Sequence, residues 1–291
     1  MNKVYLSKKL LEVEWVNEKA SKLSVDDLKK KLGDRIEKFK RYKFNTDGLV
    51  LDVGTGSGID LLALFSINPE IEVVGIDFSK KALEFAKKIL PKERSHLVLA
   101  DATHLPFREG SFKAINVSNM LHHHPLRLLK LIIKNLASLL KGDGFILIEE
   151  PSVDSEGEAL REEIDTLRFE FEVYSKIRHE ATSKRLQAYL YDLVPIFRYG
   201  TTYPSLIRKV IEECGLKIQS FDVRVEKHSI NDFKMLSELR ERIESSVIPS
   251  YEKAFLMEKV DAIAEKLKLI KPANYKSAVF KANKPNLTSM E

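Results

Sequence analysis

A glycine-rich segment that follows a short apolar stretch offers the clearest chemistry in this sequence. Residues 49–58 read LVLDVGTGSG, so Asp52 stands two residues before Gly54, and Gly56 and Gly58 follow. Glycine permits backbone angles and close approaches that a side chain would block, so the amide groups of such a loop and the start of the next helix can face a ligand. The pattern predicts a strand, a loop and a helix that together form a pocket for a small polar cofactor.

The spacing of the glycines bears on which cofactor this is. A dinucleotide-binding loop has the pattern G-x-G-x-x-G, whereas this chain has G-x-G-x-G with an acid two residues ahead of it. The segment resembles the first motif of the class I S-adenosylmethionine (SAM)-dependent methyltransferases, which place an acid and then G-x-G-x-G after the first strand.

Two further acids end the next two apolar runs. The run VVGID ends at Asp77, just before Phe78, and the run HLVLAD ends at Asp101, just before Ala102. A carboxylate at a strand end can bind the two hydroxyl groups of a ribose, which NAD and SAM share, so Asp77 alone does not discriminate. An acid at such a place is also an ordinary helix cap or turn residue. The second run resembles the adenine-recognition motif of the same family, and the three acids support the resemblance together.

Polar side chains and a run of histidines follow the fourth apolar segment. Ser118 and Asn119 end that segment and are followed by MLHHHP, where members of the family place the residues beside the transferred methyl group. Histidine titrates near neutral pH, so His123 and His124 are candidate general bases, with a structural role as the alternative. Adjacent residues on an extended loop point alternately and do not converge readily on one ion, so we expect no metal.

Strand-like and helix-like segments alternate between residues 49 and 150. This alternation predicts a parallel sheet with helices on both faces and a ligand site outside the carboxyl ends of the strands. The first expected strand runs from residue 49 into the glycine loop, and the others cover 73–77, 96–101, 112–119, 145–151, 216–225 and 275–282, with helices at 59–65, 80–90, 126–140 and 204–214 and a turn at 141–144. The expected fold class is α/β: a doubly wound, Rossmann-like methyltransferase sheet, mostly parallel with an antiparallel terminal strand, and with helical insertions that form a lid.

The expected organisation is a core that is interrupted twice. It comprises a basic helical arm at 1–44, a SAM-binding core at 45–151, a helical lid insertion at 152–203, the rest of the core at 204–283 with a second helical insertion at 230–271, and a flexible tail at 284–291. Eight aromatic residues lie between Phe169 and Tyr203, which favours a lid that walls an apolar or aromatic substrate pocket. Ordinary packing of an inserted helical layer is the alternative.

The net charge of +5 is concentrated in the arm. Residues 1–44 carry 13 Lys and Arg against 7 Asp and Glu, whereas the other 247 residues carry 35 against 36. A basic arm could steer an anionic substrate such as RNA toward the cleft. We favour a solvated helix face whose apolar side packs on the core, because the basic residues alternate with acids.

The composition sets the remaining bounds. No run of about 18 apolar residues occurs, and the first residues have neither signal nor membrane character, so we expect a cytoplasmic protein without membrane contact. A single cysteine, Cys214, excludes an internal disulfide. Few glutamines and abundant Lys and Glu are typical of a thermophilic source.

The resemblance implies a function and a set of residue roles. The expected enzyme is a SAM-dependent methyltransferase, similar to the quinone and sterol type, that methylates an O, C or N centre of a small, apolar or aromatic molecule by in-line displacement. The implied cofactor contacts are Asp52, Gly54, Thr55, Gly56 and Gly58 for the methionine moiety, Asp77 for the ribose, Phe78, Asp101 and Ala102 for the adenine and Ser118 at the methyl site, with Asn119, His123 and His124 as catalytic candidates. The alternatives are an RNA or protein methyltransferase that uses the arm, and an NAD-dependent oxidoreductase on the same sheet topology.

Overall fold

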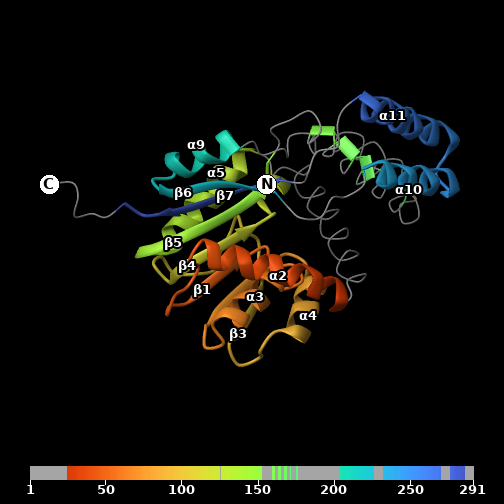
Figure 1. The fold of residues 1–291 in the computed structure, drawn as a ribbon. Helices are drawn as coiled ribbons and strands as arrows, with labels where there is room; N and C mark the ends of the chain where they lie inside the picture. Colours follow the sequence, from red (N-terminus) through yellow and green to blue (C-terminus); the bar gives the residue numbers. More distant parts are fainter. Residues whose placement is uncertain are drawn as a thin grey trace. The chain divides into compact units, whose positions relative to one another are not determined.

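The computed structural model describes most of the chain (Figure 1). The described residues are 25–124, 126–152, 204–225, 232–269 and 276–285, together with parts of the segment 159–175. The chain divides into two compact units. The larger, here called the sheet unit, comprises Lys9–Glu150, Ser205–Asp222 and Ala278–Glu291, and the smaller, the helical unit, comprises Met1–Lys8, Pro151–Pro204 and Val223–Ser277.

The sheet unit is built on seven strands in the order β3-β2-β1-β4-β5-β7-β6 (Figure 1). The strands are β1 Val50–Val53, β2 Val73–Asp77, β3 Ser95–Leu99, β4 Phe112–Ser118, β5 Leu140–Pro151, β6 Lys217–Val225 and β7 Lys276–Asn283. Strand β1 pairs in parallel with both β2 and β4, and β5 pairs in parallel with β4, whereas β7 is antiparallel. The expected doubly wound α/β sheet with an antiparallel terminal strand is therefore confirmed.

Helices cover both faces of this sheet. One face carries α2 (Val25–Arg41), α3 (Ile59–Ile67) and α4 (Lys80–Ile89), and the other carries α5 (Leu126–Leu139) and α9 (Pro204–Glu213). Successive strand residues point to opposite faces, so Val50 is buried with the first group of helices and Leu51 with the second. The same alternation places Asp52 on the face of α2 and α3. None of the described helices combines the length and the apolarity needed to cross a bilayer.

Helix α2 belongs to the arm that carries the excess positive charge. Phe39 is fully buried, and Tyr42 and Phe44 just beyond the helix enter the same apolar core. The apolar side of the described part of the arm therefore packs on the sheet. Residues 1–24 of the expected helical arm lie outside the described residues.

One expected turn is part of a strand. Residues 141–144 lie within β5, where the pairing with β4 shifts register: Phe112 pairs with Leu140, and Ala114 pairs with Phe145. A Cβ atom at Gly144 would lie 2.9 Å from the Lys113 carbonyl oxygen. Glycine thus lets the irregular part of β5 stay close to β4, so the turn-forming residues are accommodated inside the sheet.

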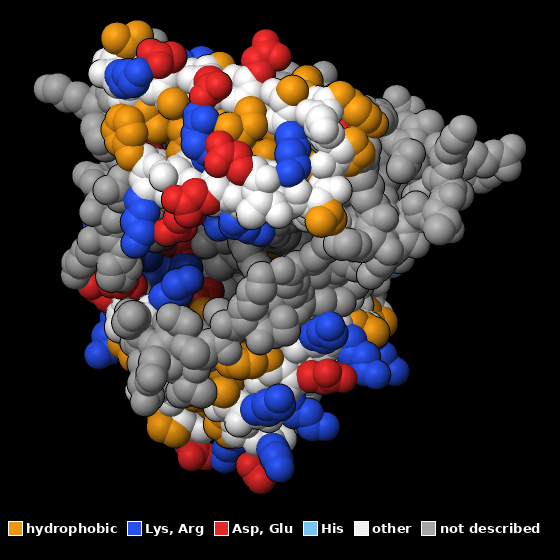
Figure 2. Space-filling model, turned by 90° about the vertical axis from the view of Figure 1, so that its right-hand side faces the viewer, with side chains coloured by type: hydrophobic (Ala, Val, Ile, Leu, Met, Phe, Trp, Pro, Cys, Tyr) orange, Lys and Arg blue, Asp and Glu red, His pale blue; other side chains and the backbone are white. Residues whose placement is uncertain are grey.

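The helical unit has an apolar core of its own. Its first part consists of four side chains at helical spacing in the first insertion: Leu160, Ile164, Leu167 and Phe171. They pack with α10 (Asp232–Ser245) and α11 (Ser250–Leu269) of the second insertion. Phe233 of α10 and Phe255 of α11 are exposed apolar side chains. In the upper part of Figure 2, apolar and charged side chains are interspersed on the surface. Of the eight aromatic residues expected in the lid, Phe171 is buried in this core, and the other seven lie outside the described residues. The lid stays a prediction.

Candidate cofactor and active site

The glycine loop after β1 is tied to the end of β2. The backbone N–H groups of Gly54 and Thr55 both donate to the Ile76 carbonyl at 2.9 Å, and the N–H of Gly58 donates to the Thr55 carbonyl at 2.9 Å. Gly54, Gly56 and Gly58 have positive φ angles of 77°, 52° and 82°, which glycine adopts without strain. The loop therefore turns sharply from the carboxyl end of β1 into α3.

The three glycines are needed for different reasons. A Cβ atom at Gly54 would lie 2.8 Å from Met120 Cγ, and one at Gly58 would lie 3.0 Å from Ala86 Cβ, so neighbours fill both positions. A Cβ atom at Gly56 would meet only the Gly54 carbonyl oxygen, at 3.8 Å. Gly56 is therefore the loop position with free space beside it.

Asp77, the last residue of β2, binds the loop from the neighbouring strand. Its Oδ2 accepts a hydrogen bond from the N–H of Gly56 at 2.8 Å, and its Oδ1 accepts one from the N–H of Ser79 at 2.8 Å. Ser79 in turn caps α4, because its Oγ accepts from the N–H of Ala82 at 3.0 Å. Burial raises the pKa of Asp77 although these backbone N–H groups oppose the shift. Each carboxylate oxygen has a second lone pair, which leaves Asp77 able to bind a diol.

The residues predicted to bind the adenine lie at the carboxyl ends of β2 and β3. Phe78 directly follows β2, while Asp101 lies two residues beyond β3 and forms an isolated bridge with His104. The strand is shorter than expected because Asp101 starts a turn, in which its Oδ1 accepts from the N–H of Thr103 at 3.0 Å. Ala102, within this turn, is buried. Because β2 and β3 pair in parallel, these residues share the sheet edge of the glycine loop.

Polar side chains replace the apolar core where β1 and β4 end. Asp52 is opposite Asn116 in the parallel register, and Asn116 Nδ2 donates to Asp52 Oδ1 at 2.7 Å and to Asp60 Oδ2, on α3, at 2.9 Å. All three side chains are buried. Asp52 Oδ2 is also buried, and it has no hydrogen-bond partner among the described residues. The described part of the site thus contains a carboxylate oxygen without a hydrogen-bond donor.

Helix α2 brings two cations to the same place. Nζ of the fully buried Lys38 lies 2.8 Å from Asp60 Oδ2, 2.8 Å from Ser118 Oγ and 3.1 Å from Glu149 Oε2. Arg35 lies one turn earlier, with its Nη1 2.6 Å from Glu149 Oε2 and its Nε 3.5 Å from Asp60 Oδ1. We call Arg35, Lys38, Asp52, Asp60 and Glu149 the buried charge cluster. Within the part of the chain that the structure describes, this cluster contains three carboxylates and two cations, and both cations pair with Asp60 and Glu149.

The two aspartates of the buried charge cluster respond differently to burial. Burial and the nearby charge of Asp60 raise the pKa of Asp52 to about 7, although the hydrogen bond from Asn116 opposes the shift. Burial also opposes ionisation of Asp60, but the adjacent Lys38 and Arg35 outweigh it and lower the pKa of Asp60 below its usual range. The surroundings therefore favour the ionised form of Asp60 and disfavour that of Asp52.

A short turn, η1 (Leu121–His123), follows β4 and is held by Glu150 of β5. The fully buried carboxylate of Glu150 accepts from the N–H groups of Met120 at 2.9 Å, Leu121 at 2.7 Å and His122 at 3.3 Å. Three donors on one carboxylate fix the backbone of the turn. The segment after β4 is thus set by a residue from the neighbouring strand.

Asn119 leads from β4 into this turn. Its φ of 51° is left-handed, and its N–H donates to the Glu149 carbonyl at 2.8 Å. Its Oδ1 is buried and, like Asp52 Oδ2, has no hydrogen-bond partner in the described ranges. The next residue, Met120, packs against Gly54. Within the described ranges, the ends of the adjacent strands β1 and β4 thus each carry a buried acceptor without a donor beside the glycine loop.

The structure separates the three histidines of this segment. His122 Nδ1 lies 2.7 Å from Glu150 Oε2, and its side chain is half-buried. His124 is buried with Nδ1 3.2 Å from the Met120 carbonyl, and the side chain of His123 lies outside the described residues. The histidine with the carboxylate partner of a general base is His122, which the sequence-based candidates His123 and His124 omit.

Sequence reasoning also missed Arg35, Lys38 and Glu149. The arm offers many Lys and Arg with no spacing that marks these two. Glu149 and Glu150 end a predicted strand, so the strand-end rule that selects Asp77 applies to them as well. The structure brings the predicted Ser118 into contact with Lys38 rather than leaving its hydroxyl to the site alone.

The hydrogen-bonding groups at this edge of the sheet match those of SAM in polarity. The ribose hydroxyls are hydrogen-bond donors, and Asp77 is an acceptor that already holds the loop. The amino group is a cationic donor, and Asp52 Oδ2 is a buried acceptor without a donor among the described residues. Gly56 leaves space that a side chain would fill. Among the residues that the structure describes, no group of His, Cys, Asp or Glu is arranged to hold a metal ion.

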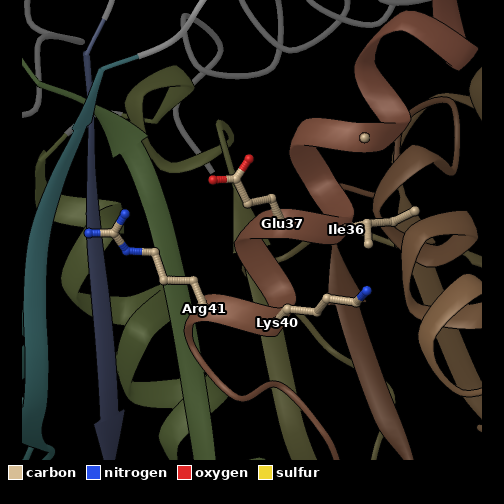
Figure 3. A pocket seen from close by; sticks show the side chains of 5 residues that line it. Ile36, Glu37, Lys40 and Arg41 are labelled. Carbon is tan, nitrogen blue, oxygen red and sulfur yellow. The ribbon is translucent and has the colours of Figure 1, made fainter.

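A pocket of 590 Å³ lies elsewhere along α2 (Figure 3). Its lining includes Gly33, Ile36, Glu37, Lys40 and Arg41. Figure 3 shows the side chains of Lys40 and Arg41 extending away from each other. The described lining thus lacks the converging polar groups of a cofactor site.

The sheet order, the glycine loop and the acids at the strand ends define a class I SAM-dependent methyltransferase domain, and this chain contains one. Residues 50–144 match a family model described as a methyltransferase domain. The resemblance deduced from the motifs is thereby confirmed, and an NAD-dependent oxidoreductase is not retained.

Individual known proteins resemble the chain over part of its length. It is 35% identical over 120 residues to the ubiquinone/menaquinone biosynthesis C-methyltransferase of Citrifermentans bemidjiense, a match that covers 38% of this chain and 48% of that protein. It is 30% identical over 152 residues to the EEF1A lysine methyltransferase 2 of Homo sapiens, covering 45% of this chain and 63% of that protein. The chain thus spans about half of the first relative and somewhat more of the second.

Among solved structures, the fold is similar to phosphoethanolamine N-methyltransferase 2 of Haemonchus contortus in complex with phosphomonomethylethanolamine and S-adenosylhomocysteine. The TM-score is 0.51 at 20% identity, over 87% of this chain and 52% of that chain. At this identity the likeness is one of fold.

Proposed function

We propose that this protein is a SAM-dependent methyltransferase that methylates a small molecule. The observation that carries the proposal is the edge where β1 and β2 end. There Gly56, which has free space beside it, donates to Asp77, and Asp52 presents a buried oxygen without a donor among the described residues. A methyltransferase domain in the same residues supports this cofactor over other ligands of glycine-rich loops.

The proposed contacts follow the polarity of the two partners. Asp77 accepts hydrogen bonds from the ribose hydroxyls, and Asp52 accepts one from the amino group. Phe78 flanks the adenine, and Asp101 with the backbone of Ala102 binds its edge. The backbone of the glycine loop, from Gly54 to Gly58, holds the methionine moiety, and Thr55 supports it by donating from its Oγ1 to the Asp52 carbonyl at 3.1 Å.

When bound, the cofactor supplies a methyl group on a sulfonium, and the protein supplies alignment and exclusion of water. An acceptor with a hydroxyl or ammonium group must also lose a proton. Glu150 holds His122 by Nδ1, so Nε2 carries the lone pair in the neutral ring. We assign His122 Nε2 as the general base that takes this proton from the methyl acceptor, and Glu150 stabilises the resulting imidazolium.

The acceptor is proposed to be a small, apolar or aromatic molecule. The quinone methyltransferase among the relatives and the phosphoethanolamine methyltransferase among the similar folds both act on small molecules by name, which supports this class. An RNA acceptor has less support, because Arg35 and Lys38, two cations of the arm, form ion pairs with buried carboxylates. A phosphate backbone binds cations that are exposed.

A protein lysine is the second candidate acceptor. The observation in its favour is the match to a lysine methyltransferase, which covers more of this chain than the match to the quinone enzyme. A lysine ammonium must be deprotonated before attack, so this candidate uses the same His122.

The cofactor is tested by isothermal titration with S-adenosylhomocysteine (SAH) and with NADH. The proposal expects one SAH per chain and no heat from NADH. Binding of NADH in place of SAH would contradict it.

The acceptor is tested with SAM that carries a labelled methyl group. The protein is incubated with separate lipid-soluble, water-soluble small-molecule, protein and RNA fractions of a cell extract. Label in a small-molecule fraction supports the leading proposal, label in protein supports the second candidate, and label in RNA contradicts both.

A further inference from the structure

The buried charge cluster holds more acid than base. Its three carboxylates face Arg35 and Lys38 from α2, and the groups from α3, β1, β4 and β5 that meet there are Asp60, Asp52, the neutral Asn116 and Ser118, and Glu149. Arg35 and Lys38 both form ion pairs with Asp60 and Glu149, and in the described part of the chain neither forms one with Asp52. Asp52 is therefore the carboxylate of the cluster that has no direct ion pair among the described residues.

Lys38 is the centre of this arrangement. It is completely buried, and its Nζ contacts Asp60 on α3, Ser118 at the end of β4 and Glu149 near the end of β5. Asp60 then shares the Asn116 amide with Asp52. A chain of three contacts thus runs from Lys38 to Oδ1 of Asp52, whose other oxygen, Oδ2, has no hydrogen-bond partner among the described residues. Lys38 precedes the matched domain, which begins at residue 50.

We propose that Lys38 is a positioning residue of the cofactor site, which holds Asp52 through Asp60 and Asn116 so that binding of the cofactor's amino group expels a proton from Asp52. This inference rests on the proposed function. In the step, the O–H bond of the protonated Asp52 breaks and its proton passes to the buffer. The freed carboxylate then accepts an N–H hydrogen bond from the ammonium group, which supplies the missing third cation.

The charges around Asp52 agree with such an exchange. Burial and Asp60 raise the pKa of Asp52 to about 7, and the charge of Lys38 is among the influences that lower it. In the free protein Asp52 is thus partly protonated at neutral pH, and a bound cation favours its ionised form. The affinity for the cofactor should therefore rise with pH, and removal of Lys38 should move that rise to higher pH.

Calorimetry of SAH binding measures the proton directly. Titrations of the full chain in phosphate and in imidazole buffer, whose ionisation heats differ, give the number of protons released per SAH. From a free pKa of about 7 we expect release of about 0.9 proton at pH 6, 0.5 at pH 7 and 0.1 at pH 8, with a Kd about tenfold lower at pH 8 than at pH 6. Equal heats in both buffers and a Kd independent of pH would overturn the proposal.

Two variants assign the effect to its residues. Asp52→Asn should bind SAH more weakly, release no proton and show no pH dependence. Lys38→Met should move the midpoint of the affinity profile upward by about one pH unit, because a nearby positive charge is lost. A purely structural lysine would lower stability and leave the midpoint in place, which would overturn its role. Lys40→Met is the matched control, since Lys40 is an exposed lysine two residues on along the same helix.

A second form of the lysine variant guards against misfolding. Lys38→Met leaves Glu149 without one of its cations, so the double variant Lys38→Met with Glu149→Gln removes an acid and a base together and should fold where the single variant does not. It should show the same upward shift of the midpoint, and an unshifted midpoint counts against the proposal. If wild-type protein binds no SAH at all, the proposed function fails. If SAH binds without a proton, the function stands and this inference alone fails.

Discussion

The backbone N–H of Gly56 donates a hydrogen bond to Asp77 Oδ2 over 2.8 Å. This contact links the loop after β1 to the acid that ends β2, while the other oxygen of Asp77 binds the N–H of Ser79 at the start of α4. One carboxylate therefore orients both segments that flank the proposed ribose position. A ligand diol would share these oxygens with the backbone rather than displace it, because each oxygen can accept two hydrogen bonds.

Asp77→Ala is expected to weaken SAH binding by about 100-fold, which corresponds to the loss of hydrogen bonds to a charged acceptor. The melting temperature should fall as well, since the N–H groups of Gly56 and Ser79 lose their acceptor. Calorimetry and thermal unfolding check the two effects. Glu84→Gln, an exposed acid on the neighbouring α4, is the control and should change neither. Unchanged SAH affinity in Asp77→Ala would remove Asp77 from the site.

Alanine at Gly58 is expected to impair mainly folding, and alanine at Gly56 mainly cofactor binding. In Gly58→Ala the new methyl group meets Ala86 at a φ of 82°, so the free energy of unfolding should fall by about 1–3 kcal/mol. In Gly56→Ala the methyl group enters free space, so only the left-handed φ of 52° lowers stability, by about 1–2 kcal/mol, whereas SAH affinity should drop at least about tenfold. Urea unfolding and calorimetry distinguish them, and wild-type affinity in Gly56→Ala would contradict the proposed placement of the cofactor.

Local patterns were sufficient to predict the sheet and the edge at which the acids of its strand ends gather. Alternating strands and helices admit few topologies, and the carboxyl ends of parallel strands share one edge. Asp52 and Asp77 could therefore be brought together from their positions alone. The segment 141–144 was not predictable in this way, because its turn-forming residues are held beside β4 by contacts distant in sequence.

The buried charge cluster depends on such distant contacts. Lys38 and Glu149 are 111 positions apart and meet only because α2 packs across the ends of β4 and β5. A lysine on a basic, amphipathic helix gives no sign that it is the buried one, since exposed and buried lysines have the same spacing rules. The choice among three adjacent histidines likewise depends on where Glu150 points, which no periodicity encodes.

His122→Gln is expected to lower kcat for methyl transfer by about 100-fold or more, with little change in SAH affinity, because general-base catalysis contributes about 10²–10⁴. The rate is measured with labelled SAM and the acceptor that the fractionation identifies. His96→Gln is the matched control, since His96 also pairs with a glutamate, Glu72, but on the exposed surface. A wild-type kcat in His122→Gln would show that the acceptor loses its proton elsewhere.

Glu150→Gln should impair both the base and the fold. The amide oxygen of the new glutamine can still accept hydrogen bonds from part of the turn after β4. Its NH₂ group, however, would face His122 Nδ1 and backbone N–H groups, which would lose their acceptor. We expect a loss of about 1–3 kcal/mol in the free energy of unfolding, the usual cost of leaving buried donors unpaired. Urea unfolding measures this loss, and it should exceed that of His122→Gln, which leaves the Glu150 contacts to Met120 and Leu121 intact. Equal stability of the two variants would contradict the anchoring role of Glu150.

Asp52→Asn is expected to change how stability depends on pH. The pKa of Asp52 is raised from 3.8 to about 7 in the folded protein, so between these values the folded state binds more protons than the unfolded state, and the free energy of unfolding falls as pH rises. Without this carboxyl the penalty disappears, so the variant should gain relative to wild type by about 3 kcal/mol between pH 5 and pH 8. Urea unfolding of the SAH-free protein at several pH values measures the difference, and the slope is the readout because an amide in this position adds a constant cost. Parallel pH profiles for Asp52→Asn and wild type would show that Asp52 is ionised in the free protein and that its charge imposes no cost on the fold.

Asp60→Asn should behave oppositely and lose stability at neutral pH. The lowered pKa of Asp60 reflects a favourable interaction with Lys38 and Arg35, which is present above the unfolded pKa of the group and is lost as pH falls.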